Sequence, residues 1–298
     1  MIMKNLAVFF FVFSVLNFCQ AQSDNILERL QALDNNGKTW YNIDGYSVTS
    51  ENFDYNFDEK GIDKVLKKHS ITKQDVKTKD DSLNFNNIFV QKFKKANDTL
   101  TQIDSYYIVE NQNKKITVVW FIKVNGNDRA MQRELTTLII ENKIPQENFE
   151  SNRLGTINFG GRKIDLGNNS CYWTFLNDVQ CPYFGEMNWS VHKTLQDAQN
   201  SVEIQMFSTK SRKSLKISSE EDVAVDFEGV PTKAHKIVFN VSKIVSALAG
   251  GKSLTVYYVA EKVRGNYLSC VMSFWDNDEI NPETQLPPLL EKVMKLEH

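Results

Sequence analysis

Two cysteines stand ten residues apart in an aromatic stretch of the chain, CYWTFLNDVQCPYFGEMNW, residues 171–189. An Asn-Asp pair midway between Cys171 and Cys181 favours a turn. A wide hairpin can bring such a pair to disulfide distance, and an oxidising compartment would preserve the bond. We therefore expect a Cys171–Cys181 disulfide. A bond from Cys270 to either of them stays open, because connectivity cannot be deduced from sequence.

The same stretch allows a catalytic alternative, in which Cys181 is a nucleophile and His192 is its base. A neighbouring imidazole stabilises the thiolate, which is the reactive form of cysteine. The protein would then be a thiol-dependent hydrolase. No motif of a thiol enzyme surrounds Cys181, and no C-x-x-C pair suggests redox chemistry. Cys270 alternates with apolar residues on its strand, which predicts a buried and inert thiol.

Three aromatic residues form the candidate binding set: Tyr183, Phe184 and Trp189. They lie around Pro182 and Gly185, in sequence that predicts a loop. Exposed loop aromatics are good anchors for a protein partner or for the face of a sugar. The alternative is that these rings pack together as a small cluster beneath the loop.

Acidic residues supply the candidates for metal binding. Asp276, Asp278 and Glu279 follow a predicted strand, where their carboxylates could share a hard cation or simply be solvated. The histidines are scattered, and the HEXXH, G-x-S-x-G and P-loop patterns are absent from the chain. The sequence therefore predicts no cofactor.

The first residues indicate export. A short basic start is followed by thirteen nearly all apolar positions, residues 6–18, and by small residues before a cut after Ala21. This pattern is typical of a signal peptide spanning residues 1–21. Because Phe18 precedes Cys19, where a lipobox would have a small residue, we favour a soluble periplasmic or extracellular product over a lipid-anchored one.

Charge and hydropathy exclude two classes of partner. The formal net charge is −2, and basic and acidic residues are interspersed along the chain. This distribution gives no basic face for nucleic acid. After the first 21 residues, no segment reaches the apolar length of a membrane-spanning helix.

Strand patterns dominate the chain. Residues 87–93, 103–109 and 115–124 are rich in β-branched and aromatic residues, and 202–207 is a further expected strand. Residues 118–122 are apolar on both alternating faces, which predicts a central strand. Gly160-Gly161 predicts a tight hairpin within 156–167.

Amphipathic spacing predicts helices between these strands. The expected helices cover residues 25–33, 61–69, 128–142 and 281–297, with a short one over 193–201. This order is not a strict alternation of strands and helices. It predicts an α+β fold of antiparallel sheets with a few packed helices.

We expect two lobes, residues 22–146 and 147–298, joined in the polar stretch 144–153, and we find no internal repeat in the sequence. Without a catalytic constellation, the sequence favours an exported, non-enzymatic binding protein of the bacterial cell envelope with a protein partner. The alternatives are the thiol hydrolase and a glycan-binding module that uses the loop aromatics.

Overall fold

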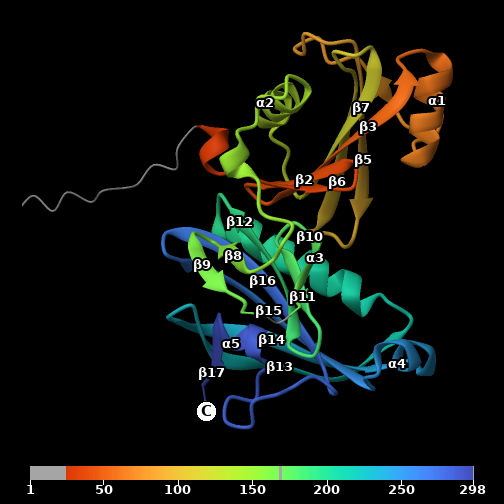
Figure 1. Ribbon diagram of the computed structural model, residues 1–298. Helices are drawn as coiled ribbons and strands as arrows, with labels where there is room; N and C mark the ends of the chain where they lie inside the picture. Colours follow the sequence, from red (N-terminus) through yellow and green to blue (C-terminus); the bar gives the residue numbers. More distant parts are fainter. Residues whose placement is uncertain (1–24, 168–169, 298) are drawn as a thin grey trace, which may run out of the picture.

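The computed structural model describes residues 25–167 and 170–297, in which two large antiparallel sheets and five α-helices form an α+β fold. The expected signal peptide, residues 1–21, lies outside the described residues. Figure 1 shows the two sheets one above the other, with the N-terminal half of the chain at the top. We call residues 25–150 the N-terminal half and residues 151–297 the C-terminal half.

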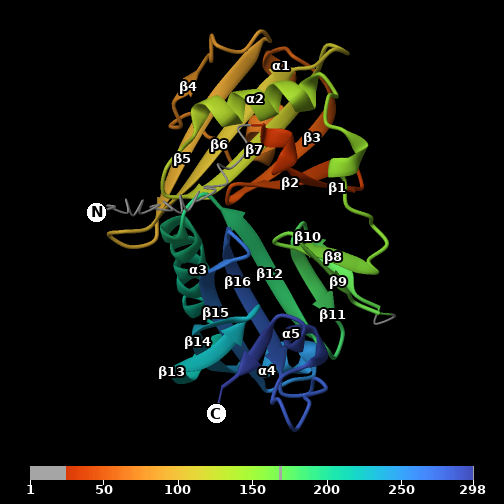
Figure 2. The same ribbon diagram turned by 90° about the vertical axis from the view of Figure 1, so that its left-hand side faces the viewer.

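The N-terminal half contains a seven-stranded sheet with the order β1-β2-β3-β7-β6-β5-β4. Its strands are β1 (Gln31–Asn35), β2 (Lys38–Ile43), β3 (Tyr46–Asn56), β4 (Lys77–Thr78), β5 (Asn87–Lys95), β6 (Thr101–Glu110) and β7 (Lys115–Val124). Helix α1 (Glu59–Lys68) packs on one face through Val65 and Leu66. Helix α2 (Arg129–Ile140) packs on the other face through Met131 and Leu135. Figure 2 shows this helix lying across the sheet.

The C-terminal half contains an eight-stranded sheet with the order β10-β11-β12-β16-β15-β14-β13-β17. Its strands are β10 (Tyr172–Phe175), β11 (Asp178–Cys181), β12 (Gly185–His192), β13 (Leu215–Phe227), β14 (Val230–Val241), β15 (Ser253–Val263), β16 (Asn266–Trp275) and β17 (Met294–Leu296). Helix α3 (Leu195–Lys210) packs on one face. A separate hairpin, β8 (Thr156–Phe159) with β9 (Arg162–Asp165), and the short helix α5 (Pro288–Glu291) cover the other. Helix α4 (Lys243–Ala249) joins β14 to β15.

The same succession of elements occurs twice along the chain. In each half, three strands are followed by a helix, four strands and a second helix, and the last of the four strands inserts beside the third. The halves differ in additions, which are β8–β9, α4 and β17. No recurring motif marks this repeat in the sequence, because the repeat is defined by the pairing of distant strands.

Several sequence expectations are confirmed. Strand β7 lies between β3 and β6 at the centre of its sheet, as its two apolar faces predict. The expected helix over 128–142 is α2 (Arg129–Ile140), and the structure adds that Asp128 caps it by accepting a hydrogen bond from the backbone N–H of Met131 at 3.0 Å. The β8–β9 hairpin turns at Gly160 and Gly161, both at positive φ. The expected α+β class of antiparallel sheets is also confirmed.

Three expected elements are wrong. Residues 25–33 form only a 3-10 turn (Ile26–Glu28) and then strand β1, because Leu33 pairs opposite Trp40 and an Asn36-Gly37 turn at positive φ closes the hairpin. A helix this short is marginal by itself, so sheet pairing prevails.

The other two errors are the expected strand 202–207 and the expected helix 281–297. Helix α3 continues through 202–207 because Val202 and Met206, four residues apart, both pack against the sheet. Only Pro288–Glu291 is helical near the C-terminus, because the chain then leaves the helix to pair β17 with β13.

The two halves touch through named contacts. The Trp40 and Phe175 rings have centroids 4.6 Å apart. The Lys193 ammonium lies 3.4 Å from Asp44 and 3.2 Å from Asp128, so one cation of the C-terminal half pairs with two carboxylates of the N-terminal half. These contacts place the start of α3 against the edge of the first sheet.

The expected boundary between residues 146 and 147 falls inside a 3-10 turn, Gln146–Asn148. The Asn148 side chain donates a hydrogen bond to the backbone carbonyl of Leu30 at 2.9 Å. Phe149 packs against the core beneath α2. The packing of the N-terminal half therefore extends to about residue 150.

Candidate functional site

The structure brings Cys171 and Cys181 together. Their sulfur atoms are 1.97 Å apart and their Cα atoms 4.1 Å apart, so the expected disulfide pairing is confirmed. The bond closes the β10–β11 hairpin. Cys270 is a free cysteine on β16, and its side chain is fully buried, as expected. Burial raises the pKa of the Cys270 thiol well above its ordinary value.

The structure does not bring Cys181 and His192 together. Cys181 pairs opposite Gly185 at the start of β12, and His192 ends the same strand seven residues later. At a rise of about 3.3 Å per residue, the two side chains lie at opposite ends of β12, roughly 23 Å apart. The Nε2 atom of His192 lies 2.8 Å from the Ser269 hydroxyl, and burial lowers the pKa of His192 to about 4.

Of the three candidate aromatics, only Tyr183 presents an exposed ring. Tyr183 is 63% exposed, whereas Phe184 is partly buried and packs on the core. Trp189 lies in β12 and not in a loop, and it is 1% exposed. Its indole N–H donates to the backbone carbonyl of Asn158 at 3.2 Å. The expected loop at Trp189 is therefore wrong, because the alternation of residues 185–192 buries this ring beneath the β8–β9 hairpin.

The acidic residues 276–279 shape a turn. The Asp276 carboxylate accepts from the backbone N–H of Lys252 at 2.7 Å, and Asp278 accepts from that of Trp275 at 2.8 Å. The backbone N–H of Glu279 donates to the Tyr183 carbonyl at 2.7 Å. Within the described ranges, no three acidic, histidine or cysteine side chains gather in a way that could hold a metal ion.

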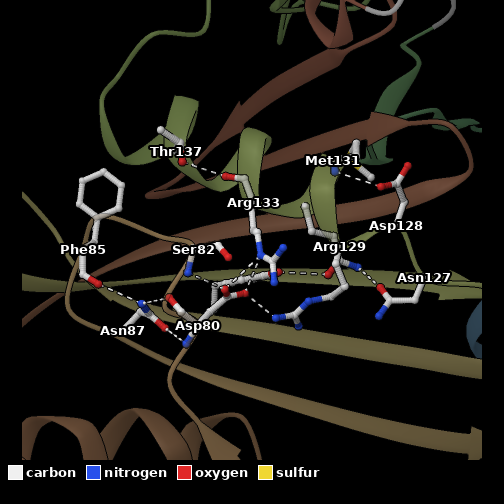
Figure 3. A network of polar contacts seen from close by, with 12 residues as sticks. Asp80, Ser82, Phe85, Asn87, Asn127, Asp128, Arg129, Met131, Arg133 and Thr137 are labelled. Atoms are coloured by element: carbon white, nitrogen blue, oxygen red, sulfur yellow. Dashed lines mark hydrogen bonds and ion pairs between the residues drawn. The ribbon is translucent and has the colours of Figure 1, made fainter.

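A buried carboxylate with two arginines lies under α2 (Figure 3). Asp80 is 4% exposed and receives hydrogen bonds from Arg129 and Arg133 and from the backbone N–H of Ser82. Burial acts to raise the pKa of Asp80, but these hydrogen bonds and both arginine charges outweigh it and leave the pKa below its usual value. Asn87 also donates to the Asp80 carbonyl at 3.0 Å. The network fastens the segment before β5 to α2, which is a structural role.

Two other carboxyl groups share a face of the second sheet. Asp178 lies opposite Asn188, and Glu186 lies opposite Gln180, so the two acids are diagonal neighbours on β11 and β12. Burial and then the charge of Asp178 raise the pKa of Glu186 to about 7, although Arg212 acts to lower it. Burial also raises the pKa of Asp178. Sequence reasoning missed this pair because only strand register brings the residues together.

The C-terminal sheet has an unpaired backbone edge. Strand β14 occupies one side of β13 along its length, whereas β17 pairs on the other side only with residues 225–227. Residues 215–223, which we call the open edge, have no strand beyond them among the described residues. The side chains of 216–222 are all exposed. Because backbone groups point alternately to the two sides of a strand, about every other residue of the open edge offers its N–H and C=O to another strand.

Exposed apolar side chains lie beside this edge. Phe207 is 42% exposed, Ile217 48%, Ile244 76% and Leu248 85%, and we call these four the apolar corner. Ile244 and Leu248 are four residues apart on α4, so they share one face of that helix.

Hydrogen bonds join the elements of the apolar corner. The backbone N–H of Ser242, which precedes α4, donates to the carbonyl of Ser214, which precedes β13, at 2.9 Å. The Lys210 ammonium at the end of α3 lies 2.6 Å from the Glu220 carboxylate on β13. The apolar corner and the open edge are therefore parts of one surface.

No protein-family model matches the chain, and no curated protein matches it either. Among solved structures, the chain is similar to one described as the crystal structure of the di-domain ARO/CYC StfQ from the steffimycin biosynthetic pathway. The identity is 11%, the match covers 88% of this chain and 76% of that chain, and the TM-score is 0.15. A likeness of this size carries no argument about fold or function. None of the helices in the described part of the chain is long and apolar enough to cross a membrane.

Proposed function

We propose that the chain is an exported, non-enzymatic binding protein of the cell envelope, which captures a protein partner by strand addition at the open edge of β13. One observation carries this proposal. Nine residues of β13 pair with β14 on one side and have no strand on the other among the described residues, and they lie beside four apolar side chains that are 42–85% exposed. Strand addition supplies affinity through main-chain hydrogen bonds, and neighbouring apolar side chains supply specificity.

The charges on the open edge favour a selective partner over self-aggregation. His235 on β14 lies 2.8 Å from both Asp222 and Glu220, which ties these carboxylates to the sheet. A bulge interrupts the β13 ladder between Ile217 and Ser219. Charges and bulges are common protection against indiscriminate edge pairing. The partner that fits is an extended segment with apolar side chains that contact Ile217 and α4.

The export part of the proposal rests on the signal-peptide pattern of residues 1–21 and is compatible with the Cys171–Cys181 disulfide, since such bonds persist in oxidising compartments. The two-lobe organisation is supported by the repeated order of elements, with separate cores around each sheet. The thiol-hydrolase alternative has no support from the geometry, because the sulfur of Cys181 is bonded and His192 is distant.

The proposal is tested by site-specific photocrosslinking in the cells that naturally carry the protein. A photoreactive residue replaces Ile217 at the open edge, and a matched one replaces Val76, which is 74% exposed on the N-terminal half. We expect a discrete adduct with one other protein from position 217 and none from position 76. Equal labelling at both positions, or adducts with a second copy of this chain alone, would overturn the proposal.

Binding measurements with the purified partner then give the free energy of the interaction. The double variant I244S/L248S removes two exposed apolar side chains, so the fold should be preserved. Burying one such side chain is worth about 1.5–3 kcal/mol. We therefore expect the dissociation constant to rise at least tenfold, whereas V76S should leave it unchanged.

A further inference from the structure

A second candidate site lies in the N-terminal half, far along the chain from the open edge. A cavity of about 620 Å³ opens where α2 ends at Ile140 and leaves the end of the sheet uncovered. Volumes of 300–1,000 Å³ are typical of small-molecule sites. Figure 2 shows α2 crossing the sheet of this half above β7.

The sheet wall of the cavity is polar, although it continues the face that forms the core. Ser50 and Asn52 are alternate residues of β3, so they share a face, and Thr117 of β7 lies opposite Asn52. The Tyr41 hydroxyl lies 3.3 Å from that of Ser50, and Asn111 donates to Thr117 at 3.1 Å. Buried polar groups on the inward face of a sheet are unusual, so they say more about a possible site than single exposed apolar side chains do. This wall is a row of hydroxyl and amide groups.

Several of these groups have hydrogen-bonding capacity left. Asn52 accepts from the Thr117 hydroxyl at 2.5 Å through its oxygen, and its NH₂ group has no hydrogen-bond partner in the described part of the chain. The side chains of Gln112 and Asn142 also line the cavity, and they make no side-chain hydrogen bond to the described residues. Amide groups that both donate and accept suit a ligand that carries several hydroxyls.

The opposite wall is apolar. It consists of the side chains at the end of α2 and in the following turn, namely Leu138, Ile139, Ile144 and Phe149. A ligand that fills the cavity therefore needs one face with C–H groups and another with hydrogen-bonding groups. A pyranose ring has both.

The charges around the cavity favour a neutral ligand. Lys115 and Asp54 pair with each other at 3.0 Å at the mouth, where Asp54 is 94% exposed. Asp34 accepts from the Thr39 hydroxyl at 2.7 Å. No unpaired cation among the lining residues is available for an anionic ligand.

From this arrangement we infer that the cavity beside the end of α2 is a binding site for a neutral saccharide unit. The polar wall holds the ring hydroxyls, and the apolar wall covers the opposite face of the ring. This site is independent of the protein partner proposed for the open edge and of the aromatic residues Tyr183, Phe184 and Trp189.

The test is saturation-transfer NMR on the full protein with matched pairs of sugars. The neutral probes are glucose, galactose and mannose, and the charged analogues are glucuronate, galacturonate and mannuronate. We expect at least one neutral probe to show saturation transfer and its charged analogue to bind at least tenfold more weakly. Binding of none of the neutral probes, or equal binding of the charged analogues, overturns the inference.

Three variants locate the site for whichever probe binds. N52A removes an exposed amide, and N142G removes another at a residue whose φ of 54° suits glycine. Because a lost hydrogen bond costs on the order of 1 kcal/mol, each should weaken binding about fivefold to tenfold. The matched control is Q74A, another exposed amide of the same half outside the cavity. Unchanged binding in both cavity variants, or equal loss in Q74A, would place the sugar elsewhere and refute the assignment.

Discussion

Replacing Glu186 by glutamine should stabilise the protein, and the gain should depend on pH. The pKa of Glu186 is raised from 4.5 to about 7 because the carboxyl is buried and lies near Asp178. Between these two values the native state retains a proton that the unfolded chain has released. The free energy of unfolding therefore falls as the pH rises through this window.

The magnitude follows from the size of the rise. Each pKa unit equals about 1.4 kcal/mol, so the full effect would be roughly 3 kcal/mol at pH 8. Partial contact of the carboxyl with solvent reduces it, and we expect about 1–3 kcal/mol. Glutamine resembles the protonated acid and cannot ionise. E186Q should therefore match the wild type at pH 4 and exceed it increasingly up to pH 8.

Urea unfolding at a series of pH values measures this difference. The matched control is E203Q, in which an exposed carboxylate is neutralised on α3, the helix that packs on the same sheet. We expect the control to change stability little at any pH. A difference between E186Q and wild type that is the same at pH 4 and pH 8, or that appears equally in E203Q, would refute the reasoning.

Two further predictions concern the folded framework. The Cys171–Cys181 disulfide joins residues ten positions apart, and reducing it should lower the free energy of unfolding by about 2–3 kcal/mol. Urea titrations with and without reductant measure this difference. No change would mean that the hairpin stays closed without the disulfide. G45A should destabilise by about 1–3 kcal/mol more than G37A in thermal or urea unfolding. Both glycines have positive φ, but an added Cβ at Gly45 would lie 2.2 Å from Nδ1 of His192, whereas at Gly37 nothing lies within 4 Å. Equal losses would show that the two halves do not pack at this point.

Local signals were sufficient where an element forms from its own residues. Gly160-Gly161 specified a hairpin because only glycine readily takes two consecutive positive φ values. The spacing of apolar residues over 128–142 specified α2, because Met131 and Leu135 lie four positions apart on its buried face. The two apolar faces of residues 118–122 specified a central strand, since both faces of β7 are covered by helices. The spacing of Cys171 and Cys181 was compatible with a hairpin, which the structure contains.

Local signals failed where a distant strand changed the outcome. Residues 25–33 have helical spacing, but β2 takes Leu33 as its partner, and the hydrogen bonds of a sheet outweigh those of a marginal helix. Residues 281–297 end beside β13, so their C-terminal part became strand β17. Trp189 looked like a loop residue because nothing in its neighbourhood reveals strand β16, whose Cys270 lies opposite Trp189.

The sequence by itself therefore determined the class of fold, the Gly160-Gly161 turn and the buried thiol, and it favoured the Cys171–Cys181 pair without excluding Cys270 as a partner. Only the tertiary structure decided the open edge of β13, the raised pKa of Glu186 and the cavity at the end of α2. Each of these depends on which strand lies beside which and on where a helix stops covering a sheet. Those relations join residues far apart in the sequence, such as Ser47 of β3 with Ile122 of β7 and Glu186 of β12 with Ser273 of β16, and short-range patterns do not encode them.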